Sequence, residues 1–478
     1  MVFGELSPMI VMKFGGASLG DADRIRHVCG IVRAHRRKQP VLVLSALRDV
    51  TDELIRIARL AARGERAAVE RGLAGLEERH RAVAAGLFDE PAQAEAARES
   101  IAGLVREVED YYRGISLLGE LSRRSLDVVV SVGERLSCRI VAAALAAAGV
   151  PAAYVDARSF LITDEDHGRA QVDFAATNRG LRRVLLPLLR RREVPVVTGF
   201  IASTRGGVTT TLGRSGSDYT AAILGAGLGA REIWVWKEVD GVCTTDPTLF
   251  PDARVVPHIS YKEAAELSHF GAEVLHPRTM LPAMRRSIPI RVRNTLRPDS
   301  PGTVITARGS RSPNPLIVSS IDGLSLVTVE GTGLVGSPAL VARVLSEVAA
   351  IGVNLYMVSM ASSEYNVTIA IPSSETARTV RHLASVLHVG RRNGRDVQNI
   401  QVEDGVAIIA TVGAGMKGQV GIAGKVFSAC GRHRVNILAI AQGSSELNIT
   451  MAVASRDLKR AVRAIHGDVV APSRDGRK

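Results

Sequence analysis

Aromatic residues and cysteines are both scarce in this 478-residue sequence. Only 4% of the residues are aromatic, and the four cysteines are scattered, at 29, 138, 243 and 430. No CxxC pair or other metal-ligand spacing is present, which argues against a structural zinc site or a disulfide framework. We therefore expect reduced thiols and a cytoplasmic protein.

Long hydrophobic runs are also missing. A membrane-spanning helix needs about 20 apolar residues in succession. The longest candidate, residues 140–155, is mostly alanine and is interrupted by Gly149 and Pro151. The N-terminus has no basic head and no cleavage site, so we predict no signal peptide and no membrane partner.

The formal net charge of +13 raises the question of nucleic-acid binding. The basic residues are spread along the whole chain, however, and they are not interleaved with aromatic residues that would stack on bases. The pattern therefore predicts no nucleic-acid partner.

Short apolar runs alternate with helical patterns over the first 300 residues. We expect strands at 10–16, 41–46, 127–134, 195–203 and 232–241, and an antiparallel pair of helices over 52–114. Continuous apolar strands separated by helices favour a mainly parallel sheet that is covered on both faces. This pattern predicts an α/β class fold, a three-layer α/β/α sandwich.

The last 160 residues contain an internal repeat. Residues 331–345 match 413–427 at an offset of 82, and the same offset relates Asn354 to Asn436. Each unit has the pattern strand, helix, strand, strand, helix, which predicts two small α+β domains of ferredoxin-like type. We expect the first at 321–403 and the second at 404–470. The segment 306–320 is expected to be a linker with a strand that completes the second domain.

The motif KFGGAS (13–18) closes the first expected strand. Two glycines allow backbone N–H groups to approach a phosphate, and Lys13 adds a positive charge. A glycine pair after a strand is more often an ordinary turn, and the Walker pattern GxxxxGK[ST] is absent.

Two further motifs carry charged groups. SVGERL (131–136) places Glu134 at an expected strand-to-helix corner, where a carboxylate can hold a substrate ammonium or stabilise a helix dipole. TTTLGRSGSDYTAA (209–222) is a glycine-rich loop followed by a helix that Ser217 or Asp218 is expected to cap. Within it, Arg214 can clamp a carboxylate through its forked guanidinium.

Together with VDGVCTTDP and AAELSHFGAEVLHPRTMLPA, these motifs resemble the aspartate kinases of the amino-acid kinase family, in this order and spacing. The resemblance covers residues 10–305, and the C-terminal repeats look like paired ACT domains. It implies transfer of the ATP γ-phosphoryl group to the side-chain carboxylate of L-aspartate, with Mg²⁺ held mainly by the ATP phosphates. The same resemblance implies biosynthesis of lysine, threonine and methionine, feedback regulation and a homo-oligomer formed through the ACT domains.

The resemblance also implies roles for individual residues. Catalysis would involve Lys13 and Asp218. Aspartate would be bound by Ser45, Thr51, Glu134, Arg214 and Ser217. ATP would be bound by Gly15, Gly16, Ser18, Trp236, Lys237, Glu238 and Asp246. An effector, lysine or threonine, would be bound by Gly336, Pro338, Asn354, Gly418, Gln419, Asn436 and Gln442.

The sequence departs from the family pattern at several positions. Ala17 stands where members usually have threonine, and Glu273 stands where many have a lysine that reaches the ATP phosphates. We expect Lys237 to replace that lysine. In the first repeat, Met360 occupies the position of Gln442, so we expect two unequal effector sites.

Two alternative functions stay open at this point: a kinase for another carboxylic amino acid, and an inactive amino-acid sensor. No GxGxxG unit follows residue 470, so we expect no fused homoserine dehydrogenase.

Overall fold

The computed structural model describes residues 9–271, 275–309, 316–331, 338–360, 366–387, 389, 397 and 399–470. The chain folds as two compact units, residues 1–242 with 275–307, and residues 243–274 with 308–478. The domain boundaries given above stay a prediction. No helix in the described ranges combines the length and the apolar character needed to cross a bilayer.

A mainly parallel sheet forms the centre of the first unit, as predicted. Its strands are β1 (Ile10–Phe14), β2 (Pro40–Leu44), β3 (Ala152–Val155), β5 (Val194–Thr198), β8 (Glu232–Lys237), β10 (Ile290–Asn294) and β11 (Thr303–Thr306). Among these seven strands the spatial order is β3-β5-β2-β1-β8-β10-β11. The pairings from β3 to β10 are parallel, and β10 pairs with β11 in the antiparallel direction. Strand β1 is therefore central, between β2 and β8.

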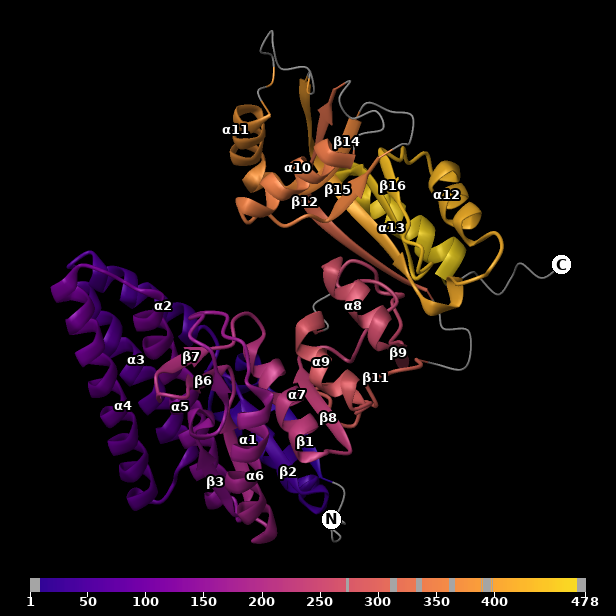
Figure 1. Ribbon diagram of the computed structural model, residues 1–478. Coiled ribbons are helices and arrows are strands. Elements are labelled where there is room, and N and C mark those ends of the chain that lie inside the picture. The colour runs from indigo at the N-terminus through magenta and orange to yellow at the C-terminus, as the bar shows by residue number, and fades with distance from the viewer. Residues whose placement is uncertain are drawn as a thin grey trace. The chain divides into compact units, whose positions relative to one another are not determined.

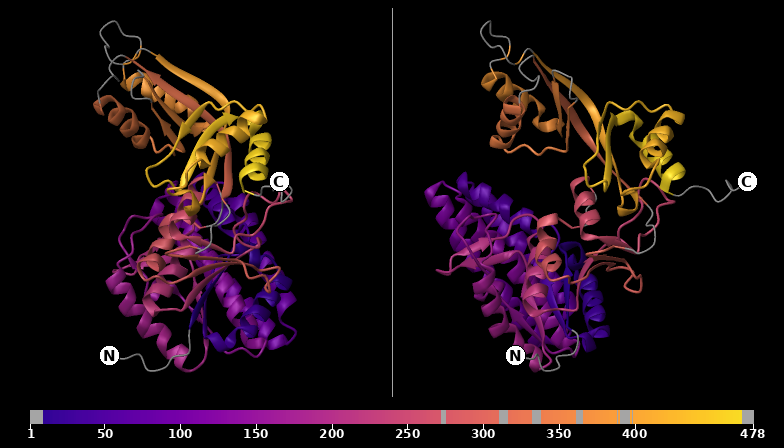
Figure 2. Two further views of the ribbon diagram at one scale, coloured as in Figure 1. Left: turned by 90° about the vertical axis from the view of Figure 1, so that its right-hand side faces the viewer. Right: turned by 45° about the vertical axis from the view of Figure 1, so that its right-hand side comes forward.

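Helices cover this sheet on both sides (Figure 1, Figure 2). The helices of this unit are α1 (Ala22–Ala34), α2 (Val50–Ala62), α3 (Arg66–Leu87), α4 (Pro91–Leu118), α5 (Arg123–Ala147), α6 (Phe174–Arg190), α7 (Gly216–Leu228) and α9 (Pro277–Arg285). Of these, α3 and α4 pack on other helices. A smaller sheet joins β4 (Ile162–Thr163), β6 (Ile201–Thr204) and β7 (Thr209–Thr211). The helical region expected over 52–114 is three helices rather than a pair.

The strand predicted at 127–134 is wrong, because these residues lie inside α5. Ser122 caps this helix by accepting a hydrogen bond from the Ser125 N–H. All residues from 129 to 138 are buried, since α5 packs against the sheet as well as against α2 and α4. A helix buried all round has a continuous apolar sequence, which cannot be told from a buried strand by periodicity. Glu134 consequently lies within a helix and not at a strand-to-helix corner.

The second unit contains the repeat as one continuous antiparallel sheet. Its strands are β12 (Ile317–Glu330), β13 (Met357–Ser359), β14 (Asn366–Pro372), β15 (Asn399–Val412), β16 (Ala439–Ala441) and β17 (Asn448–Ala454), in the order β13-β14-β12-β15-β17-β16. Its helices are α8 (Tyr261–His269), α10 (Pro338–Ala350), α11 (Thr376–Val386), α12 (Ile422–Arg432) and α13 (Leu458–Ile465), and a short strand β9 (His258–Ser260) precedes α8.

Strand β12 takes part in both repeats. Its first residues, 317–321, pair with 408–412 of β15, and its last residues pair with β14 and with 399–403 of β15. The side chains of Leu316 and Val318 belong to the hydrophobic core of the second repeat, whereas Val327 and Val329 belong to that of the first.

One buried hydroxyl offers a test of the packing between α2 and α4. Tyr112 is 1% exposed, and its hydroxyl donates a hydrogen bond of 3.0 Å to the Leu54 carbonyl oxygen. We predict that Tyr112→Phe lowers the free energy of unfolding by about 1 kcal/mol, because a single buried hydrogen bond is lost. Urea denaturation followed by circular dichroism measures the change. Tyr111→Phe is the matched control because Tyr111 is 43% exposed. Equal effects of the two substitutions would contradict the prediction.

Candidate active site

A buried ion pair lies at the carboxyl end of the central strand. Lys13 Nζ on β1 is 2.7 Å from Asp218 Oδ1 on α7, and both side chains are only about a tenth exposed. Asp218 lies in the first turn of α7, where the helix dipole stabilises a negative charge. The pair joins the sheet to α7 and holds a lysine ammonium at the edge of the sheet where ligands of parallel sheets bind.

The loop before α7 requires unusual backbone conformations. Ser215, the residue that precedes the helix, has φ 57°, in the left-handed region. The helix begins at Gly216, where a Cβ would come within 2.7 Å of the Phe200 ring. The prediction that Ser217 or Asp218 caps this helix is therefore wrong. Ser217 and Asp218 instead belong to its first turn, where Ser217 accepts a 3.0 Å hydrogen bond from Ser45.

Glu134 projects from α5 into the same region and is 3% exposed. Burial raises the pKa of its carboxyl group to about 8, although the Ala46 N–H and the charge of Lys13 favour the ionised form. Its Oε2 atom has no hydrogen-bond partner in the described part of the chain. A buried carboxylate of this kind is complementary to a cation such as an ammonium group.

A cavity of about 440 Å³ brings six of the predicted residues together. They are Lys13, Ser45, Thr51, Glu134, Arg214 and Ser217. Arg214 is exposed and forms no ion pair with a described residue. These six predicted residues therefore supply one buried carboxylate and two cationic groups, and of the two cations only Lys13 has an anionic partner among the described residues.

The sequence analysis missed Asp127, which lines the same cavity from α5. Asp127 is 2% exposed, and it accepts hydrogen bonds from Thr211 Oγ1 (2.6 Å) and from the Gly168 N–H (3.1 Å). Its carboxylate is also 2.7 Å from His167 Nδ1. Residues 127 and 134 are seven apart, so they share a face only if the segment is helical. Because we predicted a strand here, we did not recognise that Asp127 and Glu134 lie on the same face.

The residues predicted to bind ATP lie in several environments. A Cβ on Gly16 would come within 2.9 Å of the Ala46 carbonyl oxygen, so this close approach of two backbones requires glycine. The Ser18 hydroxyl is 2.8 Å from that of Thr295, and the Gly15 carbonyl accepts from the Ser18 N–H.

The residues at the end of β8 are held by neighbours within the first unit. Trp236 is fully buried and stacks on Phe14, and its strand is paired with β1 on one side and β10 on the other. The role of Trp236 in ATP binding stays a prediction. The Lys237 carbonyl accepts a hydrogen bond from Thr295. Glu238 pairs with Arg24 and Arg48, and the hydrogen bond from Arg24 is the main cause of a lowered pKa of its carboxyl group.

Asp246 belongs to the second unit, where it accepts hydrogen bonds from the N–H and the hydroxyl of Thr248. Glu273 lies outside the described residues, so the proposed exchange of its role with Lys237 stays a prediction.

The predicted effector residues that the structure describes lie in loops and at helix ends of the second unit. Gly336 is outside the described residues, and Pro338 begins α10. Exposed positions are occupied by Asn354, Gly418, Gln419, Asn436 and Gln442, as well as by Met360. The Gly418 N–H donates to Glu446 Oε2 at 2.7 Å. Their role in effector binding stays a prediction.

Comparisons with known proteins agree with this architecture. The model of the amino acid kinase family matches residues 8–294, and the ACT domain matches 327–387 and 409–468. Aspartokinase 2, chloroplastic, of Arabidopsis thaliana is 34% identical, with 95% of this chain and 83% of that protein covered. A bifunctional aspartokinase/homoserine dehydrogenase of Zea mays is 35% identical over 95% of this chain. The chain spans about half the length of this and the other first curated relatives that it matches.

Solved structures give the same result. Escherichia coli aspartokinase III in complex with aspartate and ADP has a TM-score of 0.80 and 29% identity, over 96% of this chain and 99% of that one. The same enzyme in complex with lysine and aspartate has a TM-score of 0.81 and 28% identity, over 97% and 100%. The resemblance predicted from the sequence motifs, with its two ACT domains, is confirmed.

Burial of Glu134 generates a prediction about the pH dependence of stability. A glutamate in the unfolded chain titrates near pH 4.3, whereas the pKa in the folded protein is about 8. The folded state therefore binds more protons between these values, and the stability contributed by protonated Glu134 is lost as the pH rises through that window. We predict that the wild type loses stability relative to Glu134→Gln as the pH rises, most steeply between pH 5 and 7 and less steeply near pH 8, where folded Glu134 itself begins to ionise.

Urea unfolding at four pH values in this range measures the difference. Glu99→Gln, which changes an exposed glutamate on α4, is the matched control. A constant difference between the wild type and Glu134→Gln across the range would show that Glu134 does not titrate in this way.

Proposed function

We propose that this chain, which belongs to the amino acid kinase family and within it to the aspartokinases, phosphorylates the side-chain carboxylate of L-aspartate. ATP is the phosphoryl donor, and the products are ADP and 4-phospho-L-aspartate. The reaction would open the pathway to lysine, threonine and methionine, in the cytoplasm.

The observation that carries this proposal is the distribution of charge in the 440 Å³ cavity. An amino acid has an ammonium group and an α-carboxylate, which complement Glu134 and Arg214 respectively. In this orientation the second carboxylate of aspartate is directed toward Lys13. Ser45, Thr51 and Ser217 complete the lining with hydroxyl groups that can bind its remaining oxygens.

Phosphoryl transfer needs positioning and charge neutralisation more than proton transfer. The aspartate carboxylate is already ionised, so one of its oxygens attacks the γ-phosphorus without a general base. The bond from that phosphorus to the β,γ-bridging oxygen breaks, and ADP leaves with the electron pair. Lys13, which Asp218 holds in place, neutralises negative charge on the group in transfer.

Mg²⁺ enters this proposal as part of the nucleotide substrate. The described residues contain no group of three or more histidine, cysteine, aspartate or glutamate side chains arranged for a metal ion. A cation held by the ATP phosphates would supply further neutralisation of phosphate charge. The phosphates are proposed to meet the backbone of Gly15 and Gly16 with Ser18, and the nucleotide to lie along 236–238, with Lys237 as a phosphate contact. The role of Asp246, which belongs to the second unit, stays a prediction.

Regulation is proposed to reside in the two ACT domains. A relative of known structure is described in complex with lysine and aspartate, and we propose that lysine or threonine binds here near Asn354 and Asn436. Met360 and Gln442 then make the two sites unequal. We also propose that the ACT domains assemble a homo-oligomer.

The decisive experiment is an ATP-dependent hydroxylamine assay with L-aspartate, L-glutamate and N-acetylglutamate. Hydroxylamine converts an acyl phosphate to a hydroxamate and so identifies the accepted carboxylate. We expect hydroxamate from aspartate only. Product from another acid would favour a specialised kinase, and none from any acid would favour an inactive sensor.

Arg214→Lys tests the proposed contact with the α-carboxylate. A lysine ammonium cannot form the two parallel hydrogen bonds of a guanidinium. We predict a KM for aspartate that is about tenfold higher, with the KM for ATP within about twofold of the wild type. Steady-state kinetics with each substrate varied in turn measure both values. Arg205→Lys, which changes an exposed arginine outside the cavity, is the control. A change in the ATP KM alone would contradict the substrate assignment.

The raised pKa of Glu134 adds a prediction about aspartate binding. Only the ionised carboxyl group pairs with the substrate ammonium, and the group is mostly protonated in the empty protein below pH 8. Aspartate binding at pH 7 should therefore release close to one proton per site, and the affinity should rise between pH 6 and 8. Calorimetric titrations in buffers of different ionisation enthalpy count the protons. Release of no proton by the wild type would exclude this role of Glu134.

A further inference from the structure

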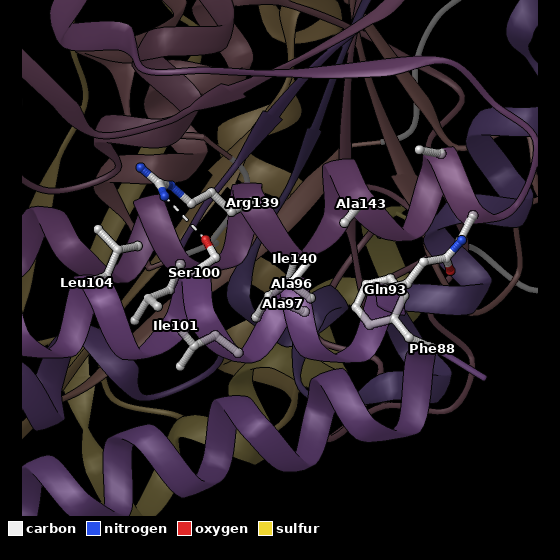
Figure 3. Close-up of a pocket in the computed structure, with 13 residues that line it drawn as sticks. Phe88, Gln93, Ala96, Ala97, Ser100, Ile101, Leu104, Arg139, Ile140 and Ala143 are labelled. Carbon is white, nitrogen blue, oxygen red and sulfur yellow. Dashed lines mark hydrogen bonds between the residues drawn. The ribbon is translucent and has the colours of Figure 1, made fainter. Parts of the chain in front are cut away.

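A second cavity lies between α4 and α5, away from the active site. Its volume is about 360 Å³, and it shares no lining residue with the proposed aspartate site. Its walls are mostly aliphatic, with Ala97, Ile101 and Leu104 on α4 and Ile140 on α5 (Figure 3). Cavities of this size with apolar walls and a few polar groups are typical of sites for small molecules.

Helix α5 contributes to both cavities with different faces. Residues 127, 130 and 134 line the aspartate cavity, and residues 136, 140, 143 and 147 line the second one. Each set repeats every three or four residues, so each forms one stripe along the helix. The second cavity is therefore a separate feature of the fold and does not depend on the proposed function.

The second cavity has a single charged residue among its mostly aliphatic lining. This residue is Arg139. Its Nη1 donates to Ser100 Oγ at 3.2 Å, and its guanidinium lies over the Tyr154 ring at 5.0 Å. Its Nε is buried without an acceptor, and Arg139 forms no ion pair with any residue that the structure describes.

The nearby acidic residue on α4, Glu107, is hydrogen-bonded to another arginine. Glu107 accepts two hydrogen bonds from Arg135, at 2.6 and 2.7 Å, and these lower the pKa of its carboxyl group. The charges of Arg158 and Arg139 lower it further, so Glu107 compensates Arg139 only from a distance, without a direct ion pair. The lining contains no aspartate or glutamate. The cavity therefore has, beside mostly aliphatic walls, an arginine that forms no direct ion pair with a described residue.

The shape of the cavity restricts the ligand further. In Figure 3 the polar groups of Arg139 and Gln93 lie at opposite ends, with alanine and isoleucine side chains between them. Ser100, which contacts Arg139, and Gln93 are separated by about 10 Å along the axis of α4, because an α-helix rises 1.5 Å per residue. An elongated ligand fits such a site better than a compact one.

We propose that this cavity binds an aliphatic monocarboxylate of medium chain length. The carboxylate pairs with Arg139 and Ser100, and the unbranched chain lies along the alanine and isoleucine side chains toward Gln93. Phe88 closes that end of the lining. An arginine fork matches a carboxylate better than it matches a neutral hydroxyl, so the acid is favoured over the corresponding alcohol.

The test is isothermal titration of the full chain with decanoate and with decanol, below the concentrations at which either aggregates. Arg139→Gln removes the charge, and Ala97→Leu fills the cavity without changing the charge. Arg113→Gln is the matched control, because Arg113 is an exposed arginine on α4 outside the lining. Circular dichroism melting shows that each variant is folded. If Arg139→Gln does not fold, Ala97→Leu and decanol carry the test.

We expect saturable binding of decanoate, at least tenfold weaker in Arg139→Gln and in Ala97→Leu, and unchanged in Arg113→Gln. Decanol is expected to bind at least tenfold more weakly than decanoate. Equal binding of acid and alcohol, or unchanged binding in Ala97→Leu, would overturn the proposal. Absence of decanoate binding, with an assembly in sedimentation experiments that Ala97→Leu dissociates, would assign the cavity to a second copy of the chain instead.

Discussion

The proposed active site in the first unit depends on the buried ion pair between Lys13 and Asp218, which links β1 to α7. A buried ammonium is unstable without a partner, and a buried carboxylate is equally so. The two charges meet at 2.7 Å only because β1 is central in the sheet and α7 begins directly above its carboxyl end. The left-handed backbone at Ser215 and the absence of a side chain at Gly216 bring α7 to this position.

The same burial gives Glu134 its distinctive chemistry. Desolvation raises the pKa of its carboxyl group, so a bound cation is needed to stabilise the ionised form at neutral pH. Asp127 lies on the same face of α5, seven residues before Glu134. Its carboxylate accepts hydrogen bonds from Thr211 and Gly168 and contacts His167. Two buried carboxylates on one helix face thus have different environments. Asp127 is bound by its own protein, whereas Glu134 keeps one oxygen, Oε2, without a partner among the described residues.

Much of this organisation could be predicted from the sequence. The central strand, the parallel sheet, the repeat and most of the charged residues of the cavity follow from apolar runs, glycine positions and motif order. The path of α5 could not be predicted, because a helix that is buried all round has no polar face and its valine-rich stretch has the composition of a strand. Asp127 was missed for the same reason. The packing of Trp236 beneath Phe14 depends on neighbouring strands that are far apart in the sequence.

The central claim is that Lys13 and Asp218 act as one unit in phosphoryl transfer. The most direct measurement is a double-mutant cycle on single-turnover formation of the acyl phosphate, with Lys13→Met, Asp218→Asn and the combination. Residues that act together give non-additive losses. We predict that Lys13→Met slows the step by roughly 10²–10⁴-fold, that Asp218→Asn slows it substantially, and that the double variant is no slower than the worse single variant. Losses that multiply, or a rate for Asp218→Asn within about threefold of the wild type, would contradict it.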